Sequence, residues 1–182
     1  MPRVLLTGFM PFGDHVDNIS EKLVNSMPLV LPIRNPFGPG RSEISIEKKI
    51  LTVDVEGSTW TQDELETREW DAILHLGLCG DCTDARIELR AQDALDMNIP
   101  DNSGRQIVGE KISGNGDLMT PVQVKRWDID SWKIQPTLST DAGRYLCNET
   151  YYRTLDALHL SDVDVPCLFL HLPDSSHMAT SD

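Results

Sequence analysis

The sequence is poor in positive charge. Its 16 lysines and arginines face 29 aspartates and glutamates, which gives a formal net charge of −13. Nucleic acids and anionic membrane surfaces are bound through clustered Lys and Arg side chains, and no such cluster offsets this acidity. We therefore expect that neither nucleic acid nor a membrane is a partner of this chain.

Long apolar runs and cysteines are also scarce. No segment approaches the roughly 20 consecutive apolar residues that cross a bilayer. Residues 1–8 reach Gly8 too early for a signal peptide. The four cysteines, at positions 79, 82, 147 and 167, are too few for a secreted disulfide scaffold. Together these absences predict a cytoplasmic protein.

Two of the cysteines form a single Cys79-x-x-Cys82 pair. A zinc site needs a second pair, or histidines at ligand spacing, and a thioredoxin-like motif opens a helix. We therefore expect a structural loop here, with no metal and no cofactor. A metal or redox centre at this pair is the less favoured alternative.

The residues that are present follow the pattern of one α/β domain. A length of 182 residues and a hydrophobic content of 40 % suit a single globular domain over residues 1–182. Apolar or β-branched segments predict strands at residues 3–7, 48–55, 71–77 and 163–172. Capped or helix-forming segments predict helices at about residues 20–27, 58–69 and 139–159. This alternation predicts a layered α/β sheet.

Cys147 is the residue that we expect to carry chemistry. Ser139, Thr140 and Asp141 predict the start of a helix, which places Cys147 within or close to its first two turns. The unpaired N–H groups and the macrodipole at a helix start favour a thiolate, the nucleophilic form of cysteine. The alternative is that Cys147 is a small buried apolar residue, the common fate of a free cysteine.

A thiol nucleophile needs a base, and the base needs an acceptor that orients it. His171 ends the last predicted strand, so a helix, a turn and a strand separate it from Cys147. That strand can return His171 to the start of the helix; alternatively, the histidine only packs at a strand end. Glu88 is one candidate acceptor among 29 acidic residues, and the residue pattern alone does not select it.

Five motifs resemble those of pyroglutamyl-peptidase I, also called pyrrolidone-carboxylate peptidase, in order and spacing. They are Thr7-Gly-Phe-Met-Pro-Phe-Gly13, Leu74-His-Leu-Gly-Leu-Cys-Gly80, Ile99-Pro-Asp-Asn102, Asp141-Ala-Gly-Arg-Tyr-Leu-Cys-Asn148 and Leu170-His-Leu-Pro173. The resemblance implies Cys147 as the nucleophile, His171 as its base and Glu88 as the acceptor. It also implies a three-layer α/β/α sandwich around a twisted mixed sheet.

The same resemblance implies a cytosolic cysteine exopeptidase whose partners are peptides with an N-terminal pyroglutamyl residue. A pyroglutamyl ring is small, flat and neutral, so its pocket should be apolar with a few hydrogen bonds. Each pocket position also has a plain core-packing interpretation. The residues that fall on pocket positions of the family are Phe9, Phe12, Leu78, Asn98, Ile99, Tyr145 and Leu146.

Three residues depart from the family's pattern. Met10 stands where bacterial members have Glu, Leu78 where many have Gln, and Asn98 where they have an oxyanion-stabilising Arg. Asparagine can donate a hydrogen bond but brings no charge, and one lost oxyanion donor costs on the order of 3 kcal/mol. The alternative function is therefore a weak or inactive homologue that binds pyroglutamyl-like small amides.

The end of the chain departs as well. After Pro173 the sequence is polar, where the resemblance implies a long C-terminal helix over one face of the sheet. Without that helix, we expect apolar surface at residues 168–172, which favours either homo-oligomers or lower stability.

Overall fold

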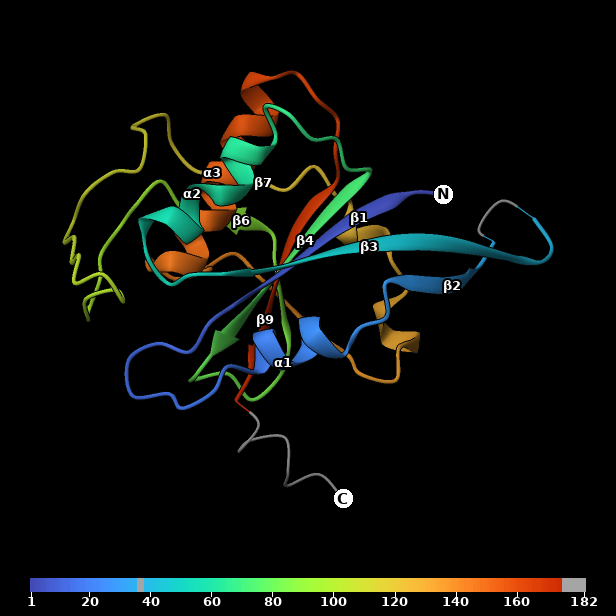
Figure 1. The fold of residues 1–182 in the computed structure, drawn as a ribbon, viewed down its shortest axis with the longest axis horizontal. Helices are drawn as coiled ribbons and strands as arrows, with labels where there is room; N and C mark the ends of the chain where they lie inside the picture. The colour runs from blue at the N-terminus through green and yellow to red at the C-terminus, as the bar shows by residue number, and fades with distance from the viewer. Residues whose placement is uncertain (36–37, 175–182) are drawn as a thin grey trace.

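The computed structural model describes residues 1–35 and 38–174. Within these residues a mixed seven-stranded sheet runs through the molecule in the order β2-β3-β1-β4-β9-β5-β8 (Figure 1). Its strands are β1 (Arg3–Phe9), β2 (Val30–Arg34), β3 (Arg41–Leu51), β4 (Ala72–Cys79), β5 (Arg86–Glu88), β8 (Thr137–Ser139) and β9 (Cys167–Pro173). A small second sheet pairs β6 (Arg90–Ala91) with β7 (Leu118–Met119).

The centre of the large sheet is parallel. Strand β1 pairs with β3 and β4, and β4 pairs with β9, all in parallel register. The two edges reverse direction, because β2 is antiparallel to β3 and β5 is antiparallel to β9. Parallel strands are buried on both faces, which explains the nearly continuous apolar sequences of β1 and β4.

Helices cover both faces, so the predicted three-layer mixed α/β fold is confirmed. Helices α2 (Val55–Glu64) and α3 (Leu146–Leu160) pack side by side on one face, and α1 (Ile19–Ser26) lies on the other (Figure 1). Leu5 and Phe169 join the core under α3, whereas Leu6 and Val24 form a second core under α1. Short 3₁₀ turns η1 (Val124–Arg126) and η2 (Ile129–Ser131) follow β7, and Val124 packs on Ile87.

Two helix starts differ from the predictions. Helix α2 begins at Val55 rather than Ser58, because the Asp54 carboxylate accepts a hydrogen bond from the Gly57 N–H. Helix α3 begins at Leu146, since Ser139 and Asp141 bond within the preceding loop instead of capping a helix.

Other predicted boundaries also shifted. Of the strand expected at residues 48–55, only residues 48–51 are extended, as the end of the longer β3, and Val55 already begins α2. The last strand begins at Cys167 rather than at residue 163. The alternating polar and apolar residues of 85–96 predict a strand with a bulge, but the structure breaks this segment into the two short strands β5 and β6. The prolines and glycines of residues 34–42 predict a loop, of which residues 36–37 lie outside the described residues. Residues 175–182 of the polar tail after Pro173 also lie outside them.

The outward side chains of β9 are partly covered. Leu168, Leu170 and Leu172 are half-buried, while Cys167 and Phe169, which alternate with them, are buried in the core under α3. The expected apolar surface at residues 168–172 is therefore reduced by packing against the α1 side of the sheet.

Candidate active site

Cys147 is the second residue of α3, as its expected place in the first two turns requires. Tyr145 occupies the N-cap and makes no side-chain capping bond. The Cys147 N–H is among the first four of the helix, which have no partner within it. Its thiol is half-buried, so Cys147 presents both a sulfur and a free backbone donor at one helix end.

The Cys147 sulfur lies against the sheet at Gly77. A Cβ atom added to Gly77 would stand 2.8 Å from Cys147 Sγ and 2.7 Å from Phe169 Cζ, closer than such atoms approach. Gly77 is also the register partner of His171 on the neighbouring strand. The absence of a side chain at Gly77 therefore allows the start of α3 to pack against the sheet beside His171.

His171 and Glu88 meet on the same face. Glu88 pairs with Phe169 across the β5–β9 ladder, which makes His171 its diagonal neighbour, within reach of long side chains. His171 Nδ1 lies 2.8 Å from Glu88 Oε1. Glu88 is fully buried and His171 is nearly so. The Nδ1 contact leaves Nε2 of the ring for the Cys147 thiol.

The surroundings of His171 favour the imidazolium. Burial alone lowers its pKa, but hydrogen bonds with Cys147 and Glu88, together with their charges, raise it to about 9. A protonated ring at neutral pH beside a thiol is the arrangement of a cysteine–histidine nucleophile.

The other free cysteine offers no such chemistry. Cys167 is fully buried, and burial raises the pKa of its thiol. The nearby His75 is also fully buried, between the hydroxyls of Thr7 and Thr154, and burial lowers its pKa to about 3. Cys167 and His75 are therefore interior residues.

A narrow apolar pocket opens beside Cys147. Its cavity volume is about 10 Å³, roughly the room for one water molecule. Five of the seven sequence-predicted pocket residues line it, and Phe9 and Leu146 belong to the core as well. The lining residues are Phe9, Phe12, Asn18, Val53, Leu78, Tyr145, Leu146 and Cys147.

Ile99 and Asn98 lie on an exposed loop beside this pocket and are not among its lining residues. Ile99 approaches Gly13, since a Cβ added there would be 3.4 Å from Ile99 Cδ1. Asn98 is exposed at the surface. The structure therefore brings Ile99 to the rim and leaves Asn98 outside the pocket.

Two lining residues, Asn18 and Val53, were missed from the sequence. Asn18 is buried, caps α1 and donates a hydrogen bond to the Met10 carbonyl. Val53 follows the end of β3. Their positions in the sequence could have indicated both residues. Val53 follows the carboxyl end of β3 and Asn18 follows the loop after β1, and ligands of α/β sheets bind at these strand ends.

Comparison with known proteins decides the family. The family model described as pyroglutamyl peptidase matches residues 2–181. The chain belongs to the pyroglutamyl peptidase family. It is therefore a member of a family of cysteine peptidases, as the sequence motifs predicted.

Individual relatives are similar to nearly the whole of this chain, which spans about four fifths of their length. The pyrrolidone-carboxylate peptidase of Fusobacterium nucleatum is 29 % identical over 177 residues, which cover 95 % of this chain and 78 % of that protein. The pyrrolidone carboxyl peptidase of Fervidobacterium islandicum has 32 % identity and a TM-score of 0.81, covering all of this chain and 86 % of that structure. The structure from Thermococcus litoralis gives a TM-score of 0.79 at 28 % identity, over 95 % of this chain and 77 % of that one.

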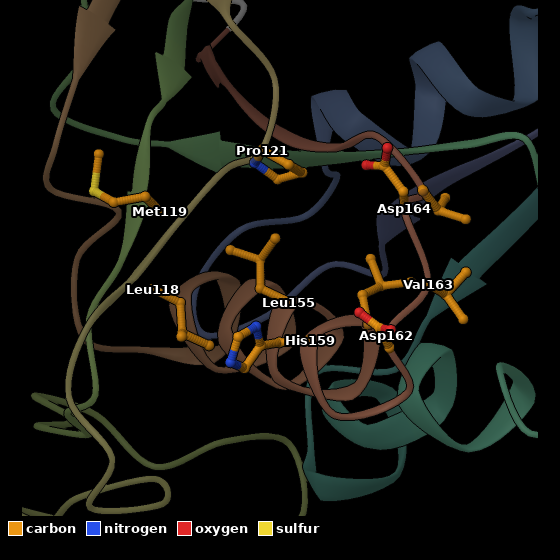
Figure 2. Close-up of a pocket in the computed structure, with 10 residues that line it drawn as sticks. Leu118, Met119, Pro121, Leu155, His159, Asp162, Val163 and Asp164 are labelled. Carbon is orange, nitrogen blue, oxygen red and sulfur yellow. The ribbon is translucent and has the colours of Figure 1, made fainter.

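This family member also has larger hollows away from Cys147. One of about 360 Å³ lies at the far end of α3, between Leu155, His159 and the segment from Asp162 to Val165 (Figure 2). His159 follows Cys147 by twelve residues on the same helix, about 18 Å along its axis. That hollow is too remote to serve the candidate triad.

The Cys79-x-x-Cys82 segment, for which the sequence favoured a structural loop over a metal or redox centre, holds a disulfide. Cys82 is buried and Cys79 ends β4, directly after the pocket residue Leu78. No group of His, Cys, Asp and Glu that could hold a metal occurs among residues 1–35 and 38–174. None of the helices described is long and apolar enough to cross a bilayer.

Proposed function

We propose that this chain hydrolyses the amide bond that follows an N-terminal pyroglutamyl residue, with Cys147, His171 and Glu88 as its catalytic triad. The contact of His171 Nδ1 with Glu88 Oε1, at 2.8 Å, carries the proposal, because it orients the ring towards a thiol at a helix start. Membership of the pyroglutamyl peptidase family supports the substrate class.

In this proposal the Cys147 thiolate attacks the pyroglutamyl carbonyl carbon. The Cys147 N–H donates a hydrogen bond to the oxyanion that forms. The His171 imidazolium then gives its proton to the leaving amine as the C–N bond breaks, which leaves a thioester on Cys147. Water, deprotonated by the now neutral His171, hydrolyses the thioester and releases pyroglutamate. Glu88 holds the ring and stabilises its charged form.

The pocket lining supports a small neutral ring. Phe9, Phe12 and Leu78 offer apolar surface, and Asn18 is a polar lining residue. The charged ammonium of an ordinary N-terminal proline would have to be desolvated among these side chains at a high cost. Pyroglutamate differs from proline by a ring carbonyl and by the absence of that charge.

The test compares pyroglutamyl-aminomethylcoumarin with prolyl-aminomethylcoumarin. We expect release of the fluorophore from the first substrate, at least about 100-fold faster than from the second, since burying an unpaired charge costs several kcal/mol. Equal cleavage of both substrates, or cleavage of neither, contradicts the proposal.

A second candidate is a binding protein with little turnover. It is favoured by the exposed position of Asn98, outside the pocket. Calorimetry with pyroglutamate distinguishes the two candidates: heat of binding without cleavage of the fluorogenic substrate supports the second.

The proposal extends to assembly and location. Peptides with an N-terminal pyroglutamyl residue are its proposed partners, and the half-buried leucines of β9 support self-association.

The cytoplasm stays the proposed location. The Cys79–Cys82 disulfide argues against this location, since disulfides are rare in the cytoplasm. Intact mass of protein extracted under thiol-blocking conditions tests whether the bridge exists in the cell.

A further inference from the structure

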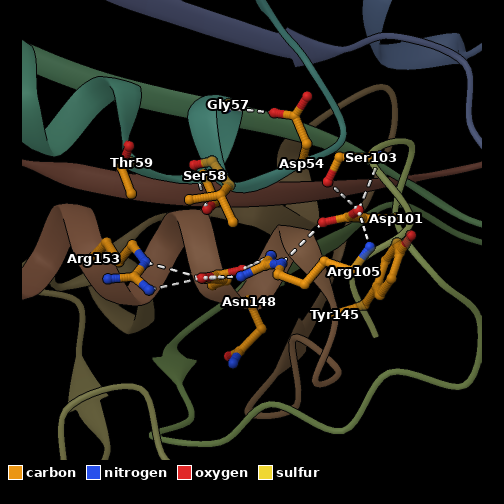
Figure 3. A network of polar contacts seen from close by, with 12 residues as sticks. Asp54, Gly57, Ser58, Thr59, Asp101, Ser103, Arg105, Tyr145, Asn148 and Arg153 are labelled. Atoms are coloured by element: carbon orange, nitrogen blue, oxygen red, sulfur yellow. Dashed lines mark hydrogen bonds and ion pairs between the residues drawn. The ribbon is translucent and has the colours of Figure 1, made fainter. Parts of the chain in front are cut away.

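A buried ion network joins the loop of residues 98–105 to helix α3. The Arg105 guanidinium donates to both carboxylate oxygens of Glu149, with Nη2–Oε2 at 2.6 Å and Nη1–Oε1 at 3.2 Å. Its Nε donates to Asp101 Oδ2 at 2.9 Å (Figure 3). The carboxylates of Glu149 and Asp101 are both fully buried. Such a network holds two segments rigidly, because breaking it leaves a buried charge unpaired.

Asp101 folds the loop around the network. Its Oδ1 accepts hydrogen bonds from the N–H and hydroxyl of Ser103 and from the Arg105 N–H. Burial opposes the charge of Asp101, but these bonds and the Arg105 side chain hold its pKa below the usual range. One arginine therefore closes the turn through Asp101 and anchors it through Glu149.

The anchored loop reaches both walls of the candidate pocket. The Tyr145 hydroxyl donates to the Pro100 carbonyl at 3.1 Å, and Asn102 Nδ2 donates to the Pro11 carbonyl at 3.1 Å. Tyr145 and Phe12, whose ring centroids are 5.8 Å apart, line the pocket from these two sides. The loop thus bridges the segment after β1 and the start of α3.

Glu149 fixes this bridge to the nucleophile. It follows Cys147 by two residues, in the first turn of α3, so the helix turn that presents the thiol also receives Arg105. We propose that Arg105 is a positioning residue, which sets the width of the pocket beside Cys147 and thereby governs substrate binding rather than bond cleavage. This inference rests on the proposed function for its substrate but not for its geometry.

Arg153 provides a matched control. It also donates to Glu149 Oε1, through Nε at 3.1 Å and Nη2 at 2.8 Å, but it lies one turn further along the same helix. Replacing either arginine removes one partner of the same buried carboxylate. Only Arg105 belongs to the loop and also binds Asp101.

The experiment compares Arg105→Met with Arg153→Met in three readouts. For Arg105→Met we expect KM for pyroglutamyl-aminomethylcoumarin to rise between about 10-fold and 100-fold, with kcat changed much less, because the pocket walls lose their preset spacing. Amide hydrogen exchange over residues 101–105 should accelerate, and iodoacetamide should alkylate Cys147 faster. Arg153→Met should leave all three near the wild-type values.

If Arg105→Met does not fold, the double variant Arg105→Met/Glu149→Gln replaces it in the same three measurements, because it removes the Arg105 and Glu149 charges together. Arg105→Lys keeps the positive charge but cannot donate to Glu149 and Asp101 in the planar geometry of a guanidinium. Its KM should therefore lie between those of Arg105→Met and the wild type. Equal effects of Arg105→Met and Arg153→Met, or wild-type exchange and alkylation in Arg105→Met, would overturn the inference. If the wild type fails to cleave the substrate, the proposed function falls, and exchange and alkylation still decide the role of Arg105.

Discussion

His171 and His75 lie on neighbouring strands and on the same face of the sheet, yet they differ in what faces their nitrogens. His171 faces Glu88 and the Cys147 thiol, whereas His75 lies between two threonine hydroxyls. Charged partners raise the pKa of the first to about 9, and burial lowers that of the second to about 3. The contrast assigns the charged form to His171 at neutral pH and the neutral form to His75.

This contrast predicts how stability depends on pH. The folded pKa of His171 lies above its ordinary 6.5, so its contribution is complete below pH 6.5 and is lost as the pH rises through 9. The loss is on the order of 3 kcal/mol, at about 1.4 kcal/mol per unit. His75 acts in the opposite sense, because its folded pKa lies below 6.5. Its contribution to stability is complete above pH 6.5 and is lost as the pH falls towards 3.

Denaturant unfolding across this pH range checks both signs. His171→Asn should remove the alkaline loss and keep the acid one, and His75→Gln should do the reverse. An alkaline loss that survives His171→Asn would show that other groups cause it.

At the scale of single residues, the sequence alone predicted only part of the candidate site. The positions of Cys147 near a helix start and of His171 near a strand end were predictable, because both are local patterns. Glu88 came only from resemblance, since its partner His171 lies 83 positions away and nothing local distinguishes it from other carboxylates. Asn98 was expected in the pocket but is exposed beside it, and Asn18 and Val53 were missed because loop paths decide what lines a pocket.

At the scale of elements, the end of β4 determines how α3 meets the sheet. Gly77 leaves room for Cys147 Sγ and the Phe169 ring, while Gly80, just beyond the strand, has no atoms within 4 Å of an added Cβ. The two glycines therefore serve as test and control at one strand end.

Gly77→Ala should lower the free energy of unfolding by about 1–3 kcal/mol, because the added methyl overpacks the core. It should also lower kcat, since the Cys147 sulfur must move away from its position over the strand. Gly80→Ala should change neither quantity. Unfolding curves and kinetics on the two variants check this, and a fully active Gly77→Ala enzyme would contradict the packing described here.

Elements were predictable where their signal is local. Strands β1 and β4 follow from apolar runs, and α3 from its good helix formers. Strands β5 and β8 are only three residues long and exist because β5 pairs with β9, joining Arg86 to the distant His171. The caps of α2 and α3 were wrong because Ser, Thr and Asp side chains cap helices and also bond within loops.

At the scale of the whole molecule, the two faces of the sheet are covered unequally. Helices α2 and α3 cover one face, and the eight-residue α1 covers part of the other. The second face keeps half-buried apolar residues, among them Leu74, Leu170 and Leu172.

This asymmetry predicts self-association through the α1 face, opposed by the net charge of −13. Sedimentation velocity should show the weight-average mass rising with protein concentration, and rising further when salt screens the charge. A monomer of 20.4 kDa at every concentration and salt level would contradict this prediction.

The most direct test of the central claim compares the two free cysteines in the fluorogenic assay. Cys147→Ala should lose at least about 1000-fold in kcat, as removal of a nucleophile does. Cys167→Ala, which truncates a fully buried side chain, should keep kcat close to that of the wild type once folded. Turnover that survives Cys147→Ala, or that disappears in a folded Cys167→Ala protein, would contradict the account.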